Sequence, residues 1–185
     1  VEVIAVASHD TASAASVVPL SAEGEKVAFL SSGTWSLLGV MSDEPILTEE
    51  ARLAGFTNEG GTDGKICFLQ NITGLWILQK LMQEWKEEGK DVAYSTLLPA
   101  AEVAETDALI DVDDTVFQCP VSMAEAITNY CIAHQQTSPS TQGEFVKCVL
   151  RSLALRYKTG MEALNRLLPE PVTKLYVIGG GSQNK

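Results

Sequence analysis

Three short polar turns carry the residues whose types suit chemistry on a phosphate or a hydroxyl group. The first is His9-Asp10-Thr11, which follows an apolar run. An alcohol that attacks phosphorus loses its proton as the new bond forms, so a carboxylate within hydrogen-bond reach can act as general base. Asp10 has the type and the place for that role. An Asp or Thr here is also typical of a helix cap, and the residue pattern alone favours the cap.

The other two turns combine glycine with hydroxyl side chains. In Ser31-Ser32-Gly33-Thr34, the glycine would let backbone N–H groups turn toward an anion, and Thr34 could donate a hydroxyl hydrogen bond. The third turn, which follows an apolar run, is Gly179-Gly180-Gly181-Ser182-Gln183-Asn184. Because its glycines have no side chains, a phosphate or a flat ligand could approach its backbone closely. This glycine run matches neither a Walker A loop nor G-x-G-x-x-G. Taken singly, both turns are also typical of ordinary chain reversals.

Apolar runs predict the strands that would position these turns. Strands are predicted over residues 3–7, 17–20, 26–30 and 35–40, and the Ser31–Thr34 turn would join the last two as a hairpin. Residues 174–178 are predicted to form a buried strand that leads into the glycine run.

Helical signals fill most of the remaining sequence. From Asn71 the apolar period becomes helical, and Gly89 is placed as a C-terminal stop. Capping boxes at Ser122-x-x-Glu125 and Thr141-x-x-Glu144 predict two further helices, the second ending before Pro169. Residues 102–119 are predicted to be a surface excursion and residues 111–114 a solvated turn. Strands followed by helices and a returning strand predict an α/β layered domain.

Composition limits the classes of partner. The 185 residues include 13 Lys and Arg against 24 Asp and Glu, a net charge of −11, which disfavours nucleic acid and requires any bound phosphate to be held locally.

The four cysteines form no C-x-x-C pair, so a zinc site or disulfide framework is not expected and free thiols favour a reducing cytoplasm. No apolar run reaches membrane-spanning length. The chain starts inside an apolar run without Met and ends where a helix would begin, so we expect a piece of a longer protein.

In their order, these motifs resemble the carbohydrate kinases of the FGGY family. The shared blocks cover residues 6–14, 30–36, 58–61, 70–79 and 177–184. His-Asp-Thr and Ser-Ser-Gly-Thr-Trp are shared by several branches of that family. The blocks Asn58-Glu59-Gly60-Gly61 and Asn71-x-x-Gly-Leu-Trp-x-x-Gln79 favour the branch that phosphorylates L-rhamnulose.

The resemblance implies a fold and a set of site residues. The family has two actin-like ATPase (ribonuclease H-like) domains with ATP and sugar in the cleft between them, and residues 1–185 would be the second, ATP-binding domain, incomplete at its C-terminal end. On the sugar side, Asp10 would accept the proton of the sugar hydroxyl, and His9 and Thr11 would line the sugar. On the nucleotide side the implied residues are Thr34 at the phosphates, Asn71 and Gln79 one helical stripe apart, and Gly179, Gly180 and Gly181 at the adenosine.

The implied reaction transfers the γ-phosphoryl group of ATP to L-rhamnulose, giving L-rhamnulose 1-phosphate and ADP, with Mg²⁺ screening the phosphates. The partner would be the absent N-terminal kinase domain, so this chain alone is expected to be inactive. Two alternatives stay open. One is a kinase for L-fuculose or another deoxyketose. The other is a non-catalytic actin-like module that binds nucleotide or a partner, against which Asp10 argues because such a module needs no base.

Overall fold

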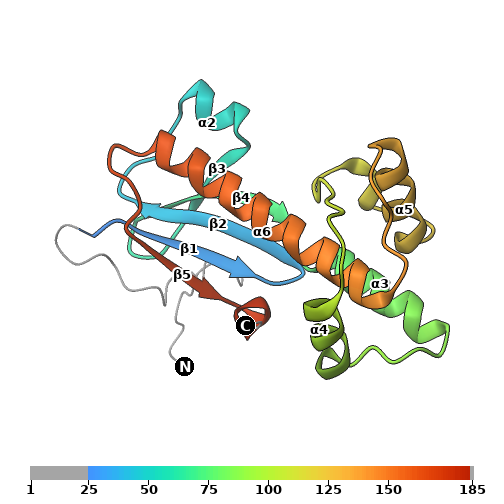
Figure 1. Ribbon diagram of the computed structural model, residues 1–185. Coiled ribbons are helices and arrows are strands. Elements are labelled where there is room, and N and C mark those ends of the chain that lie inside the picture. The colour runs from blue at the N-terminus through green and yellow to red at the C-terminus, as the bar shows by residue number, and fades with distance from the viewer. Residues whose placement is uncertain (1–24, 184–185) are drawn as a thin grey trace. The chain divides into compact units, whose positions relative to one another are not determined.

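A computed structural model describes residues 25–183 of the chain, which divide into two compact units (Figure 1). Unit 1 contains the described residues up to Ile72 together with those from Lys158 onward. Unit 2 contains the continuous stretch Thr73–Tyr157. The strands predicted over residues 3–7 and 17–20 lie outside the described residues.

Unit 1 is built on a mixed sheet. Its described strands, in the order β3-β4-β2-β1-β5, are β1 (Val27–Ser32), β2 (Trp35–Ser42), β3 (Phe56–Gly60), β4 (Ile66–Thr73) and β5 (Lys174–Ile178). β1 and β2 are antiparallel, with Ser32 opposite Ser36, so the predicted hairpin is confirmed. β3 and β4 form a second antiparallel pair, whereas β5 runs parallel to β1.

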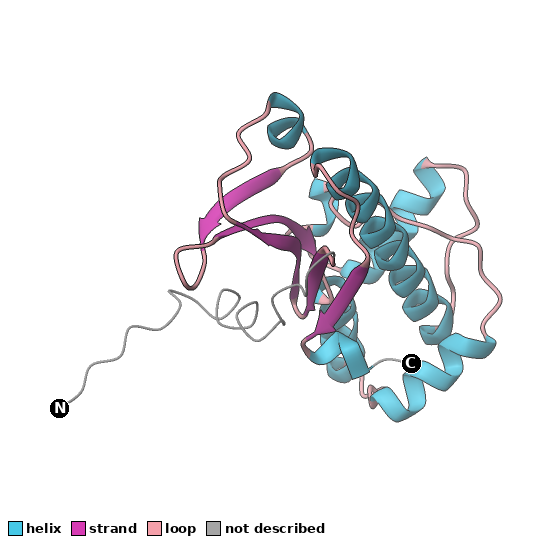
Figure 2. Ribbon diagram, turned by 90° about the vertical axis from the view of Figure 1, so that its left-hand side faces the viewer, coloured by secondary structure: helices cyan, strands magenta, loops and turns pink. Residues whose placement is uncertain are grey.

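Both faces of this sheet carry apolar clusters. On one face, Ala28, Val40 and Phe68 pack with Ala163 and Leu164 from the C-terminal part of α6 (Gln142–Leu167), the long helix that ends before Pro169 as predicted (Figure 2). The other face is formed around three buried side chains, Phe29, Cys67 and Leu69. The short helix α2 (Glu49–Leu53), capped by the Thr48 side chain, leads into β3, and no sequence signal predicted either element.

The predicted burial of residues 174–178 is wrong, although the strand itself is confirmed. Leu175 and Val177 are 41% and 45% exposed. β5 is an edge strand of the described sheet, with β1 as its neighbour there. The apolar run therefore predicted the strand correctly, but it did not predict how far the side chains on its two faces are buried.

Unit 2 is helical. It contains α3 (Trp76–Glu87), α4 (Tyr94–Val103), the short helix η1 (Thr115–Phe117), α5 (Met123–Ala133) and α6 up to Tyr157. The prediction that a helix starts at Asn71 is wrong, because Asn71 lies in β4 and α3 begins only at Trp76. Cys67, Phe68, Leu69 and Gln70 are consecutive buried residues of that strand, and the chain leaves it through Gly74.

The two predicted capping boxes mark the starts of α5 and α6. The Ser122 side chain accepts a hydrogen bond from the Glu125 N–H at 3.2 Å. At α6, the Glu144 N–H donates to Thr141 Oγ1 at 3.2 Å, and the Thr141 N–H donates back to Glu144 Oε2 at 3.1 Å. Both helix starts are thus confirmed, and the α6 cap has the full reciprocal pattern.

The segment 102–119 is not the surface excursion that was predicted. It places Ala108, Ile110, Val112 and Phe117 in buried positions. The acidic turn within it is structural rather than solvated, because Asp113 Oδ1 accepts the Thr73 N–H at 2.8 Å and Asp113 Oδ2 pairs with Arg156 Nε at 2.5 Å. Ala108, Ile110 and Val112 alternate along the chain, a short period-two signal from which their burial could have been predicted.

Candidate functional site

The turn between β1 and β2 exposes a hydroxyl and an indole at its tip. Ser32 and Ser36 are buried at its base, whereas Thr34 and Trp35 are exposed. The Gly33 N–H donates to the Trp35 carbonyl oxygen at 3.2 Å, so this amide is used within the turn rather than presented to an anion. Thr34 is exposed, and its role at the phosphates stays a prediction.

The glycine run at the end of β5 packs directly against this hairpin. Gly179 has φ +86°, and a Cβ atom there would lie 2.6 Å from the Ser32 carbonyl oxygen. A Cβ atom at Gly181 would overlap the Ser32 hydroxyl and lie 2.7 Å from Ser32 Cβ. At Gly179, only glycine can combine the left-handed backbone with so close an approach to the Ser32 carbonyl oxygen.

The local sequence explains why the two turns meet. β5 pairs with β1 so that Ile178 lies opposite Ser31, and the chain therefore leaves β5 beside Ser32. It continues into the short helix η2 (Gly180–Gln183), where the Ser182 N–H and Oγ–H both donate to the Gly179 carbonyl oxygen, at 3.1 and 2.7 Å. Two turns predicted separately thus form one surface, which we call the hairpin–glycine surface and which comprises residues 32–34 and 179–182.

This surface has room for a ligand at one glycine. Gly180 is exposed, and a Cβ atom placed on it would meet no described atom within 4 Å. Gly180 is therefore not needed for packing within the described structure, in contrast to its two neighbours. A glycine with open space beside it can be approached closely by a phosphate or a flat ring.

Asn71 and Gln79 do not lie on one helical stripe, because Asn71 belongs to β4 and Gln79 to α3. Both residues are exposed. Gln79 lies in the first turns of α3, where its N–H donates to the Leu75 carbonyl oxygen at 2.9 Å. The sites predicted for His9, Asp10 and Thr11 lie outside the described residues, so their roles stay predictions.

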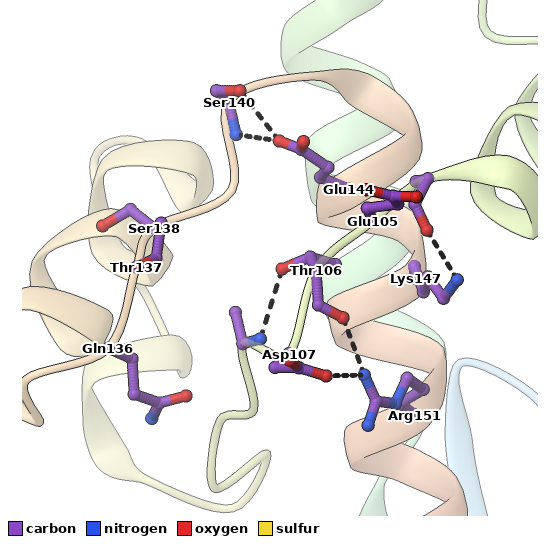
Figure 3. Close-up of a pocket in the computed structure, with 12 residues that line it drawn as sticks. Glu105, Thr106, Asp107, Gln136, Thr137, Ser138, Ser140, Glu144, Lys147 and Arg151 are labelled. Carbon is purple, nitrogen blue, oxygen red and sulfur yellow. Dashed lines mark hydrogen bonds and ion pairs between the residues drawn. The ribbon is translucent and has the colours of Figure 1, made fainter.

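A separate cavity of about 740 Å³ lies in unit 2 between α6 and the segment 104–108 (Figure 3). Its two basic side chains bind the protein itself: Lys147 Nζ donates to the Ala104 carbonyl oxygen at 2.6 Å and Arg151 Nη1 to the Thr106 carbonyl oxygen at 2.7 Å. Glu144, which lines the same cavity, belongs to the α6 cap. None of the predicted site residues lines this cavity, so its volume adds nothing to the candidate site.

The thiols and acidic groups of the described structure form no metal centre. Within residues 25–183, no group of three or more His, Cys, Asp or Glu side chains is arranged to hold a metal ion. Burial raises the pKa of Cys67 to about 11 and that of Cys148 to about 12, so both thiols stay protonated near neutral pH. Over the same residues, every helix is too short or too polar to cross a bilayer.

Comparison with protein families and curated sequences identifies carbohydrate kinases. The model of the FGGY family of carbohydrate kinases, C-terminal domain, matches residues 28–185. Over its full length the chain is 45% identical to a rhamnulokinase from Bacteroides thetaiotaomicron and covers 37% of that protein. A rhamnulokinase from Pectobacterium carotovorum is 43% identical, and the chain covers 36% of it. The chain thus spans little more than a third of the curated relatives that it matches.

Solved structures support the same fold. The xylulose kinase from Rhodospirillum rubrum aligns with 94% of this chain at a TM-score of 0.61 and 13% identity, the chain covering 33% of it. The xylulose kinase from Bifidobacterium adolescentis aligns with 88% of this chain at a TM-score of 0.55 and 16% identity, the chain covering 30% of it. The predicted α/β fold of the actin-like ATPase type is therefore confirmed.

Proposed function

Because the chain belongs to the FGGY family of carbohydrate kinases, we propose that it is the ATP-binding part of an L-rhamnulose kinase. The full-length enzyme transfers the γ-phosphoryl group of ATP to L-rhamnulose and releases L-rhamnulose 1-phosphate and ADP. Identity of 45% to a rhamnulokinase along the whole chain supports the choice of sugar. The contact between the β1–β2 hairpin and the glycine run supports the assignment of these two turns to nucleotide binding.

ATP fits the hairpin–glycine surface in its chemical requirements. Thr34 supplies an exposed position for a phosphate oxygen, and the open backbone at Gly180 admits a flat group such as the adenosine. Gly179 and Gly181 hold that backbone against Ser32 and so fix its position relative to the hairpin. Asn71 and Gln79 contribute exposed amide groups for further nucleotide contacts.

We infer that a magnesium ion accompanies the nucleotide in this reaction. Mg²⁺ in kinases is held by one or two carboxylates together with the substrate phosphates, rather than by a cage of protein ligands. The ion supplies charge neutralisation on the phosphate oxygens during transfer.

Asp10 is the general base in this proposal. Its carboxylate takes the proton from the attacking sugar hydroxyl, and His9 and Thr11 line the same side of the site. A net charge of −11 makes local phosphate binding necessary, and in this proposal the exposed Thr34 and the open backbone at Gly180 serve that purpose. The remaining sugar contacts come from the N-terminal domain, so the isolated 185-residue chain does not phosphorylate sugar.

The proposal is tested by turnover of the full-length protein with ATP, Mg²⁺ and candidate ketoses. L-rhamnulose is expected to give the highest kcat/KM, ahead of L-fuculose and D-xylulose. Equal or better use of L-fuculose would refute the sugar assignment. Failure to phosphorylate any of the three would refute the kinase proposal as a whole, and turnover by the isolated chain would refute the need for a second domain.

The base is tested by Asp10→Asn, with Asp63→Asn as the matched control. Asp63 lies in an exposed turn at φ 54°, a conformation that Asn accepts readily, and the substitution changes the charge equally. Loss of general-base catalysis is expected to lower kcat by about 10²- to 10⁴-fold with little change in the KM for ATP. The Asp63 variant is expected to keep wild-type kinetics. A kcat for Asp10→Asn within about threefold of the wild type would exclude Asp10 as the base.

A further inference from the structure

One carboxylate in unit 2 binds both ends of that unit. Asp113 Oδ1 accepts the backbone N–H of Thr73 at 2.8 Å, and Asp113 Oδ2 accepts Arg156 Nε at 2.5 Å. Thr73 is the first residue of unit 2, and Arg156 is the last but one. Asp113 therefore joins the point where the chain enters unit 2 to the point where it leaves.

The carboxylate is itself held in place. The Asp113 N–H donates to Asp111 Oδ1 at 3.1 Å, and the neighbouring Val112 side chain is buried. The side chains of Asp113 and Arg156 are only 33% and 21% exposed. A charge-assisted pair in such a partly shielded position fixes both partners more firmly than a surface ion pair does.

Thr73 lies shortly before α3, the helix that carries the predicted nucleotide contact Gln79. It is the last residue of β4, two positions after Asn71, and α3 with Gln79 follows at once. The Thr73 N–H belongs to the end of a strand, where the chain turns away through Gly74. Fixing this amide restrains the chain just before the first turn of α3.

From this geometry we propose that Asp113 is a positioning residue for ATP, acting through the start of α3, the helix that carries Gln79. The inference rests on the proposed nucleotide-binding function of Gln79. Asp113 does not touch the nucleotide, and its effect is on where the Gln79 side chain is held. Small displacements of binding groups are costly for phosphoryl transfer because catalysis depends on position.

The variant Asp113→Asn removes one of the two hydrogen bonds that the Asp113 carboxylate accepts from Thr73 and Arg156. An Asn side chain has only one acceptor oxygen, and its NH₂ group cannot accept from a second donor. It can therefore satisfy Thr73 or Arg156, but not both. The matched control is Asp114→Asn, which removes the same charge one residue later and affects only the η1 cap, where Asp114 accepts the Val116 N–H at 3.0 Å.

The experiment measures steady-state kinetics and ATP binding by calorimetry on the full-length protein and both variants. Asp113→Asn is expected to raise the KM and Kd for ATP about five- to tenfold while the KM for the sugar changes less than twofold. Asp114→Asn is expected to leave all three constants within twofold of the wild type. A purely structural role for Asp113 would instead lower the unfolding temperature and the active fraction without moving the affinity for ATP.

Each outcome decides between the two proposals. If the wild type phosphorylates L-rhamnulose and Asp113→Asn binds ATP as the wild type does, the positioning role is overturned and the kinase proposal stands. If the wild type binds ATP without phosphorylating any sugar, the kinase proposal fails and calorimetry still tests Asp113. If the wild type does not bind ATP, both fail. Should Asp113→Asn not fold, Arg156→Lys weakens the same pair from its other side, and an unchanged Kd for ATP in that variant overturns the inference.

Discussion

The substitution Gly179→Ala tests whether the glycine run is held against the hairpin as the structure shows. Two costs add at this position. A non-glycine residue at φ +86° is strained by about 1–2 kcal/mol. The new Cβ would also lie 2.6 Å from the Ser32 carbonyl oxygen, a backbone atom that cannot rotate away, and such overpacking costs about 1–3 kcal/mol.

The expected loss of unfolding free energy is therefore about 2–5 kcal/mol, a large share of a stability that is about 5–15 kcal/mol in typical domains. In a domain of 150–250 residues such a loss lowers the unfolding midpoint by about 4–20 °C. Gly180→Ala is the matched control, because its Cβ would meet no described atom within 4 Å. That variant is expected to change stability by less than about 1 kcal/mol.

Thermal unfolding of the full-length protein, followed by circular dichroism, measures both variants under one buffer. Gly181→Ala is also expected to destabilise the protein, because its Cβ would lie 2.7 Å from Ser32 Cβ, which cannot rotate away. Equal midpoints for Gly179→Ala and Gly180→Ala would refute the packing of the glycine run on Ser32. Calorimetry adds a functional measurement: Gly180→Ala, although stable, is expected to weaken ATP binding because its methyl group occupies the open approach.

Three further predictions concern stability and reactivity. Asn58→Ala removes two 2.9 Å hydrogen bonds between its side chain and the backbone of the preceding loop, and is expected to cost about 1–3 kcal/mol by urea unfolding. In a thiol-modification assay near pH 8, the exposed Cys119 is expected to react well before Cys67 and Cys148, whose pKa values burial raises to about 11 and 12. Hydrogen bonds from the residues before α6 hold the pKa of Glu144 below its usual 4.5, so its stabilisation is present above that pH and is lost as the pH falls through the lower value. Glu144→Gln is therefore expected to show a smaller loss of stability than the wild type between about pH 5 and 3, and an equal loss would contradict the capping role.

Local signals in the sequence were sufficient for turns and caps. The Ser31–Thr34 hairpin, the Ser122 cap and the Thr141–Glu144 capping box depend on residues a few positions apart, and all three are confirmed. The strand before the glycine run was also predicted. Such features are visible in a single sequence because the interacting groups are neighbours along the chain.

Features that depend on distant partners were missed. Asp113 pairs with Arg156, 43 residues away, and nothing in the acidic run indicated it. The β4–α3 boundary was misplaced because the apolar pattern around Asn71 fits a buried strand end as well as a helix start. The individual turns of the candidate site were predicted, yet their contact was not, since it depends on the pairing of β5 with β1.

That pairing has a consequence for the order of folding. Lys26 and Thr173, which share a hydrogen bond where β1 and β5 meet, are 147 residues apart, whereas unit 2 is one continuous segment. Closing a long loop costs entropy that short-range contacts avoid, and non-local strand pairing is correspondingly slow. We therefore expect unit 2 to fold early, shortening the effective loop, and β5 to dock late. The hairpin–glycine surface would then be among the last parts of the described chain to form.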